Sequence, residues 1–263
     1  MISIYKLEIK NSLKTLAIWS LAVGIMGFFC IVLYASMKGD IENMAVSFAQ
    51  MGAFSEAMGL NKLSIATLNG YFATEIGTIH GLGSGLFAAI AATCVLSKEE
   101  DGHTGEFLFA LPVSRGKIVA AKLLSVISNI VIFNVICSAC YLGGFAVLGE
   151  EIAMREFFIF MGMQMLMNVE IALICFAISA FCKKNALGVG LGVALICYIY
   201  DIICRAVPMM KDQLVWGPYS FANAAEIFTK ADFSTIAIVT GVVMIALCIG
   251  VAFWRYLSRD LAS

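Results

Sequence analysis

The stretch SKEEDGHTGEFLFALPVSRGK, residues 97–117, is a polar island between two long apolar runs. Within it lies a shorter apolar segment, FLFALP at 107–112, that is too brief to cross a bilayer. The runs on either side are each long enough to span about 30 Å of hydrocarbon. The island therefore predicts a loop that joins two membrane spans on one side of a membrane.

The composition excludes an ordinary soluble domain. Hydrophobic residues make up 61% of the chain, charged residues only 13%, and the mean hydropathy is +0.94. A soluble protein of 263 residues needs more charged groups to cover its surface. The chain holds only three prolines, which favours long uninterrupted helices. We expect an all-α membrane protein that forms one transmembrane domain over residues 1–263, with membrane lipids and no nucleic acid among its partners.

Six apolar runs are long enough to be transmembrane helices. They cover approximately residues 15–37, 71–97, 118–148, 156–182, 185–207 and 234–257. Before the first run, residues 1–14 place apolar side chains on one helical face and lysines on a neighbouring face, which predicts an amphipathic helix in the membrane interface. An even number of spans puts both termini on the same side.

Basic residues gather on that side. It holds eleven of the seventeen lysines and arginines: Lys6, Lys10, Lys14, Lys98, Arg115, Lys117, Lys122, Lys183, Lys184, Arg255 and Arg259. Cytoplasmic loops carry an excess of Lys and Arg. We therefore predict a multi-pass protein of the cell (cytoplasmic) membrane, with both termini and the 98–117 loop in the cytoplasm.

Two segments on the opposite, extracellular side are longer than a connection requires. Residues 38–70 carry Met and Phe at helical spacings, which predicts a helix on the outer leaflet or one that caps the bundle. Residues 208–233 are rich in aromatic side chains, which predicts a belt at the outer interface. We favour a capping role for both over contact with a substrate.

Ionisable residues inside the spans are expensive and point to function by default. Asp201 and Arg205 are spaced to pair along one helix face, which is the plainer explanation for both. His80 lies alone in the second run near Glu75, where a hydrogen-bonded packing role is favoured. Glu170 in the fourth run has no local partner.

Glu170 is therefore either protonated or paired across the bundle with a group such as His80, Asn134 or Asn168. His80, Glu170, Asp201 and Arg205 are the candidates for the substrate path or for gating.

No catalytic motif accompanies these residues. The chain has no Walker motif, no GxSxG and no HExxH, and it has only two histidines. The glycine runs 81–85 and 188–192 do not follow a strand and lack the Lys-Ser/Thr of a phosphate loop, so we interpret them as packing faces. The nine cysteines lie mostly in apolar runs, where they act as small hydrophobes. We expect no enzymatic activity, metal or cofactor in the chain itself.

The 98–117 loop has the composition of a short docking helix. Thr104 or Asp101 can cap it, Glu106 suits the positive end of its dipole, and Pro112 ends it. Its apolar residues are Phe107, Leu108, Phe109 and Leu111. Such a helix has nothing of its own in which to bury these side chains, so it needs the groove of a partner.

The sequence of the loop resembles that of the ABC-2-type permease subunits of bacterial ABC exporters. Their pattern is E-x-x-G-T-x-E-x-L-x-x-x-P-V-S-R-x-x-I-x-x-x-K. The matching residues here run from Glu99, Gly102, Thr104 and Glu106 through Leu108, Pro112, Val113, Ser114 and Arg115 to Ile118 and Lys122, with Leu111 directly before the proline. One residue departs from the pattern, because His103 is inserted between the glycine and the threonine.

The resemblance implies a permease that forms a dimer with an identical or paralogous second permease subunit and binds two copies of a separate ABC ATPase subunit. ATP and Mg would be bound by that ATPase. The loop would be the coupling helix that seats in a groove of the ATPase, through Glu99, Gly102, Thr104, Glu106, Phe107, Leu108, Phe109, Leu111, Pro112, Ser114 and Arg115. The substrate path would be lined largely by the second and fifth spans, which here carry His80, the 81–85 glycines and Asp201.

Two other functions fit a chain of six spans. A secondary transporter driven by an ion gradient would use Glu170 or Asp201 as a proton relay, but inverted repeats are not evident. A non-transporting scaffold or an intramembrane enzyme is the other alternative, and the latter lacks a catalytic constellation. The secondary transporter, moreover, has no need of an apolar helix in the cytoplasmic loop.

Overall fold

The computed structural model describes residues 1–104, 112–230 and 234–258, which form helices, turns and loops and no strands. Six helical segments are long and apolar enough to cross a membrane, as predicted. They are Ile2–Ala49 (α1), Leu68–Thr93, Arg115–Leu148 (α7), Met154–Ser179 (α8), Leu187–Ala206 (α9) and Thr235–Ser258 (α11). The second consists of α3 (Leu68–Tyr71), a π-helical turn η1 (Phe72–Ile76) and α4 (Gly77–Thr93).

Helix-breaking residues lie between these spans. Pro112 precedes α7, Pro208 begins the 3₁₀ helix η2 (Pro208–Trp216), and Pro218 lies in the turn that follows it. Gly149 ends α7 with a φ of 74°, in the left-handed region that glycine adopts without strain. The apolar runs between such residues are therefore free to continue as single helices.

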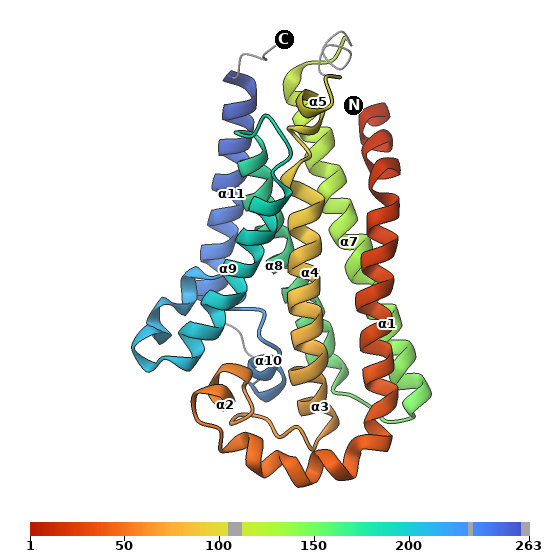
Figure 1. Cartoon of the computed structure of the whole chain (residues 1–263), viewed down its shortest axis with the longest axis vertical. Coiled ribbons are helices and arrows are strands. Elements are labelled where there is room, and N and C mark those ends of the chain that lie inside the picture. Colours follow the sequence, from red (N-terminus) through yellow and green to blue (C-terminus); the bar gives the residue numbers. More distant parts are fainter. Residues whose placement is uncertain (105–111, 231–233, 259–263) are drawn as a thin grey trace.

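The spans run side by side, with α1 against α7 and α4 beside α8 and α9 (Figure 1). The amino terminus, the short helix α5 (Lys98–Asp101) and the end of α11 lie at the same end of the bundle (Figure 1). This end is called the loop end below. Because the first and last helices have their terminal ends on the same side, the number of spans is even, as predicted.

The beginning of the chain differs from the prediction. Residues 2–14 do not form a separate interfacial helix, because α1 continues without a break through 48 residues. Ile4 packs against Ile118 and Ala121 of α7, and Glu8 is also buried. The amphipathic pattern of this segment therefore serves contacts with α7 along part of the helix.

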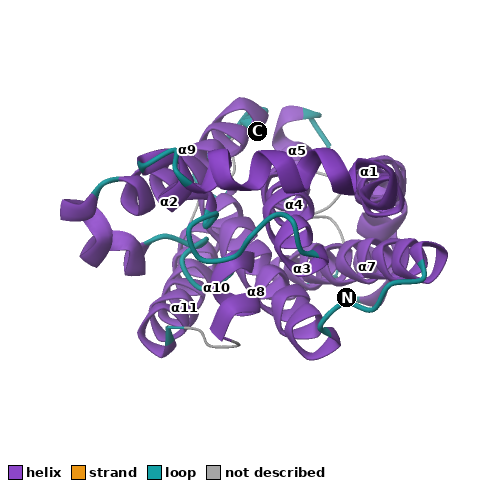
Figure 2. Ribbon diagram, turned by 90° about the horizontal axis from the view of Figure 1, so that it is seen from below, coloured by secondary structure: helices purple, strands orange, loops and turns teal. Residues whose placement is uncertain are grey.

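The opposite end is covered by the first long connection. The last turns of α1 and the short helix α2 (Ala53–Met58) lie across the lower end of the bundle (Figure 2). This matches the capping helix that the Met and Phe spacing predicted for residues 38–70.

The second long connection is only partly at the surface. Trp216 is 69% exposed, as expected for a residue of an interfacial belt, but Tyr219 and Phe221 are 5% and 2% exposed. The chain from 217 to 222 enters the bundle before α10 (Ala224–Lys230) begins. The predicted belt is therefore wrong for Tyr219 and Phe221, whose rings are part of the core.

Glycines of α4 leave room for this entering segment. The Tyr219 hydroxyl donates to the carbonyl of Gly81 at 3.2 Å, and a Cβ at Gly85 would overlap the Tyr219 hydroxyl. The glycine run 81–85 is thus a packing face, as predicted.

Candidate functional site

The base of the 98–117 loop is organised around a buried lysine. The side chain of Lys122, on α7, is 0% exposed. Its Nζ donates to the carbonyl of Val95 at 2.5 Å and to Glu99 Oε1 at 2.6 Å, and it lies 3.1 Å from Glu8 Oε1. Three segments meet at this ammonium group: the chain just after α4, α5, and α1.

A second lysine completes the network. Lys98 of α5 donates to the other carboxylate oxygen of Glu8. Two lysines and two glutamates therefore balance in charge. Buried charges are tolerated only when they are paired and hydrogen-bonded, so the network fixes the distance from α5 to α1 and α7. We call Glu8, Lys98, Glu99 and Lys122 the loop-base network.

The chain between α4 and α5 also contacts the end of α8 and the residues just before α9. The backbone N–H of Leu96 donates to Ser179 Oγ, at the end of α8, at 2.9 Å. The thiol of Cys94 donates to Asn185 Oδ1, two residues before α9, at 3.4 Å. The base of the loop is thus joined to α1, α7, α8 and the start of α9.

The predicted docking residues divide between those that the structure describes and those that it does not. Glu99 belongs to the loop-base network. The backbone N–H of Gly102 donates to the carbonyl oxygen of Lys98 at 2.9 Å, and the backbone N–H of Thr104 donates to the carbonyl oxygen of Glu99 at 2.8 Å. Pro112 and Ser114 precede α7, and Arg115 is its first residue. The remaining predicted docking residues, Glu106, Phe107, Leu108, Phe109 and Leu111, lie outside the described residues.

The inserted residue has a distinct backbone. His103 has a φ of 53° and is the non-glycine residue with positive φ in the described part of the chain. It lies in the turn that directly follows α5.

Two residues of the loop-base network belong to the sequence motif, although the network itself was not predicted. Glu99 and Lys122 are the first and last positions of the resemblance pattern, and the structure brings them into contact. In the sequence, Lys122 contributes to the orientation and is the last match of the motif, but a buried ion pair there was not predicted. Glu8 was missed, and its one signal is that it is an acidic residue among Lys6, Lys10 and Lys14.

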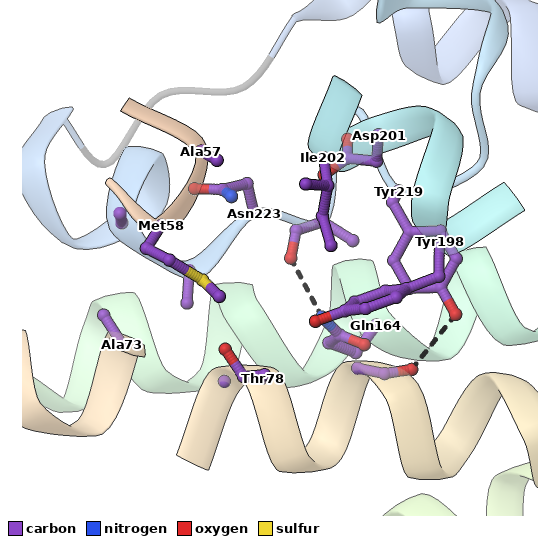
Figure 3. Close-up of a pocket in the computed structure, with 15 residues that line it drawn as sticks. Ala57, Met58, Ala73, Thr78, Gln164, Tyr198, Asp201, Ile202, Tyr219 and Asn223 are labelled. Atoms are coloured by element: carbon purple, nitrogen blue, oxygen red, sulfur yellow. Dashed lines mark hydrogen bonds between the residues drawn. The ribbon is translucent and has the colours of Figure 1, made fainter. Parts of the chain in front are cut away.

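A small polar cavity lies between the second and fifth spans. It measures about 60 Å³ and is bounded by α2, α4, α8, α9 and residues 219–225 (Figure 3). Gln164 of α8 donates from Nε2 to the carbonyl of Ala222 at 2.9 Å, whereas its buried Oε1 has no hydrogen-bond partner within the described residues. Thr78, Tyr198 and Asp201 also line the space. Its size and polarity suit a few water molecules or a small polar group.

Asp201 and Arg205 form the predicted pair, and the pair belongs to a larger network. Arg205 donates to both carboxylate oxygens of Asp201 at 2.8 and 3.1 Å, and to Glu226 Oε1 at 3.0 Å. Glu226 also accepts from Lys62 Nζ at 2.8 Å. Burial alone would raise the pKa of Glu226, but the adjacent Arg205 and Lys62 hold this pKa below its ordinary value. The network ties α9 to α10 and to the connection that follows α2.

His80 has the hydrogen-bonded packing position that was favoured for it. The ring is fully buried, with Nδ1 3.0 Å from the Tyr141 hydroxyl and Nε2 3.3 Å from Asn134 Oδ1. It adjoins an aromatic cluster centred on Phe72, whose ring packs against Phe157 and Phe160 at centroid distances of 5.7 Å.

Glu170 does not pair with the partners proposed from the sequence. His80 and Asn134 bond to each other, and Asn168 has no side-chain hydrogen bond in the described part of the chain. Glu170 is 3% exposed, and its Oε2 has no hydrogen-bond partner among the described residues. Gly241 of α11 lies directly opposite this oxygen. Within the described residues, Glu170 thus shares no hydrogen bond or ion pair with His80, Asp201 or Arg205.

Comparison with known protein families agrees with the fold and with the loop motif. The model of the family described as ABC-2 family transporter protein matches residues 2–261. A search among curated proteins finds no match. Because the family model covers nearly the whole chain and the structure has six candidate spans, the chain belongs to the ABC-2 family and is a membrane-spanning permease component of an ABC transporter.

Proposed function

We propose that the chain is the permease of an ABC exporter, which moves substrate across the cytoplasmic membrane with energy from a separate ATPase docked on residues 98–117. In this proposal the loop end faces the cytoplasm, and two ATPase copies bind ATP and Mg. The excess of basic residues at the loop end supports the orientation.

The loop-base network is the observation that carries the proposal. A docking loop transmits force only if it is attached to the helices that must move. Lys122 attaches the loop to α1 and α7, and the contacts of Leu96 and Cys94 attach it to α8 and the start of α9. A push on the loop therefore reaches the fifth span, which lines the polar cavity, through direct contacts.

A second permease subunit would dock on the outer face of α9. Gly188 and Gly192 lie one turn apart, and a Cβ at either position would meet nothing within 4 Å. The same face continues with the exposed side chains of Ile196, Ile199 and Ile203. Small residues at this spacing allow two helix backbones to approach closely in a membrane.

The substrate path in this proposal includes the polar cavity between the second and fifth spans. Asp201 lines it and is held in place by Arg205, which also bonds to Glu226. Glu170, buried against Gly241, remains a candidate for gating between α8 and α11, and His80 a candidate for positioning α4.

Copurification with the ATPase tests the docking. We expect the chain to copurify with an ABC ATPase, and the double variant Phe107→Ala/Phe109→Ala to lose that association, because it removes the apolar surface of the loop. Phe158→Ala is the matched control, since Phe158 is an exposed aromatic residue at the other end of the bundle. Full retention of the ATPase by the double variant would contradict the docking. A chain that has no ATPase partner would fit a secondary transporter instead.

A further inference from the structure

An apolar pocket lies where the first long connection folds back on the start of the second span. Its volume is about 180 Å³, three times that of the polar cavity. Phe48 of α1, Phe54 and Met58 of α2, and Leu60 contribute its apolar side. Thr74 and Glu75 of η1 and Thr78 of α4 contribute its polar side.

Glu75 makes this pocket chemically distinctive. It lies seven residues into the second span, in the π-helical turn Phe72–Ile76. Its side chain is exposed, and no hydrogen bond or ion pair joins it to any other residue that the structure describes. A carboxylate within a membrane span is costly and normally has a partner. Insertions of π-helix in α-helices are frequent at functional sites.

We propose that this pocket binds amphipathic organic cations, which place an ammonium group beside Glu75 and an apolar group among Phe48, Phe54 and Met58. The volume fits one aromatic ring or a short branched chain, since an apolar cavity of about 150 Å³ holds benzene. Aromatic faces attract quaternary ammonium groups, and methionine adapts to ligands of different shape. The unpaired carboxylate selects for positive charge over neutral or negative ligands.

The pocket adjoins the polar cavity between the second and fifth spans. Met58 and Thr78 line both spaces, and Figure 3 shows these two side chains at the edge of the polar cavity. The pocket and the cavity therefore share a boundary that includes Met58 and Thr78. The role of the pocket as part of an export path rests on the proposed function, whereas the binding itself does not.

The binding is tested with radiolabelled benzyltrimethylammonium and the full chain, purified in an uncharged maltoside detergent that offers no ammonium group of its own. We expect saturable binding that unlabelled benzyltrimethylammonium displaces and that benzyl alcohol and phenylacetate do not. Glu75→Gln should weaken binding about tenfold or more, as expected for loss of a charge-assisted contact. Phe54→Leu should weaken it about two- to fivefold through loss of the aromatic face.

Glu42→Gln is the control, because Glu42 is another exposed carboxylate at this end of the bundle, outside the pocket. Equal binding by Glu75→Gln and the unsubstituted chain, no saturable binding, or displacement by phenylacetate would each overturn the site. Glu75-dependent binding by a chain that shows no ATP-driven export would support the site and contradict the proposed function. Export that is insensitive to Glu75→Gln, together with unchanged binding, would overturn the site alone.

Discussion

Glu170 of α8 lies so close to Gly241 of α11 that position 241 has little room for a side chain. A Cβ at Gly241 would lie 2.8 Å from Glu170 Oε2 and 3.0 Å from the ring of Phe221. Both neighbours are buried, so a side chain at position 241 would have to displace packed groups. The sequence displayed an isolated carboxylate in the fourth span but not the helix that faces it, because that contact joins residues far apart in the chain.

We predict that Gly241→Ala lowers the free energy of unfolding by about 1–3 kcal/mol, the usual cost of overpacking a core. Gly250→Ala on the same helix should be neutral or slightly stabilising, because a Cβ there meets nothing within 4 Å. Thermal unfolding of the two variants in detergent measures the difference. Equal unfolding midpoints would show that Glu170 and α11 are not in tight contact.

Lys122 is the residue on which the loop end depends most. Removal of one partner from a buried ion pair strands the other charge, so Lys122→Met should destabilise the chain by about 3 kcal/mol. The exposed Lys117, five residues earlier on α7, provides the control, and Lys117→Met should change stability by less than about 0.5 kcal/mol.

A double variant separates the charge effect from packing. In the background of Lys122→Met, Glu99→Gln should cost less than it does alone, with a coupling of about 1 kcal/mol or more. The free energies of unfolding of the two single variants and the double variant give this coupling. Strictly additive effects would mean that Glu99 and Lys122 do not interact.

At the scale of elements, the long apolar runs, their helical periodicity and the polar or helix-breaking residues between them predicted the six spans and the capping connection. These depend on local patterns, which a sequence displays directly. The continuity of α1 could not be predicted in this way, because burial of Ile4 and Glu8 depends on α7, more than a hundred residues away. The entry of residues 217–222 into the bundle was missed for the same reason. Its signal, an uncharged stretch of small and aromatic residues opposite a glycine run, is visible only once α4 is placed beside it.

The outer face of α9 leads to a prediction for the dimer. Gly192→Ile should weaken association of two permease subunits about tenfold or more, since a branched side chain holds two helix backbones apart. Gly162→Ile on α8 is the control, because a Cβ at Gly162 also meets nothing within 4 Å. Capture of an untagged copy by a tagged copy in native membranes measures association. Undiminished capture of Gly192→Ile would place the subunit interface elsewhere.

Across the whole molecule, the two ends of the bundle are held together differently. At the loop end, the loop-base network and two hydrogen bonds join the 94–99 segment to α1, α7, α8 and the start of α9. At the other end, Arg205 joins α9 to α10 and, through Glu226 and Lys62, to the first connection. The fifth span therefore has ionic or hydrogen-bonded contacts at both of its ends, and the polar cavity lies beside it.

The rate of ATP hydrolysis by the assembled complex in liposomes tests the central claim most directly, since it needs no knowledge of the substrate. We predict that the permease changes the hydrolysis rate of its ATPase, that Phe107→Ala/Phe109→Ala returns it to the rate of the isolated ATPase, and that Phe158→Ala does not. A hydrolysis rate that is the same with the unsubstituted chain, with the double variant and with no permease would contradict the claim that the 98–117 loop couples this chain to ATP.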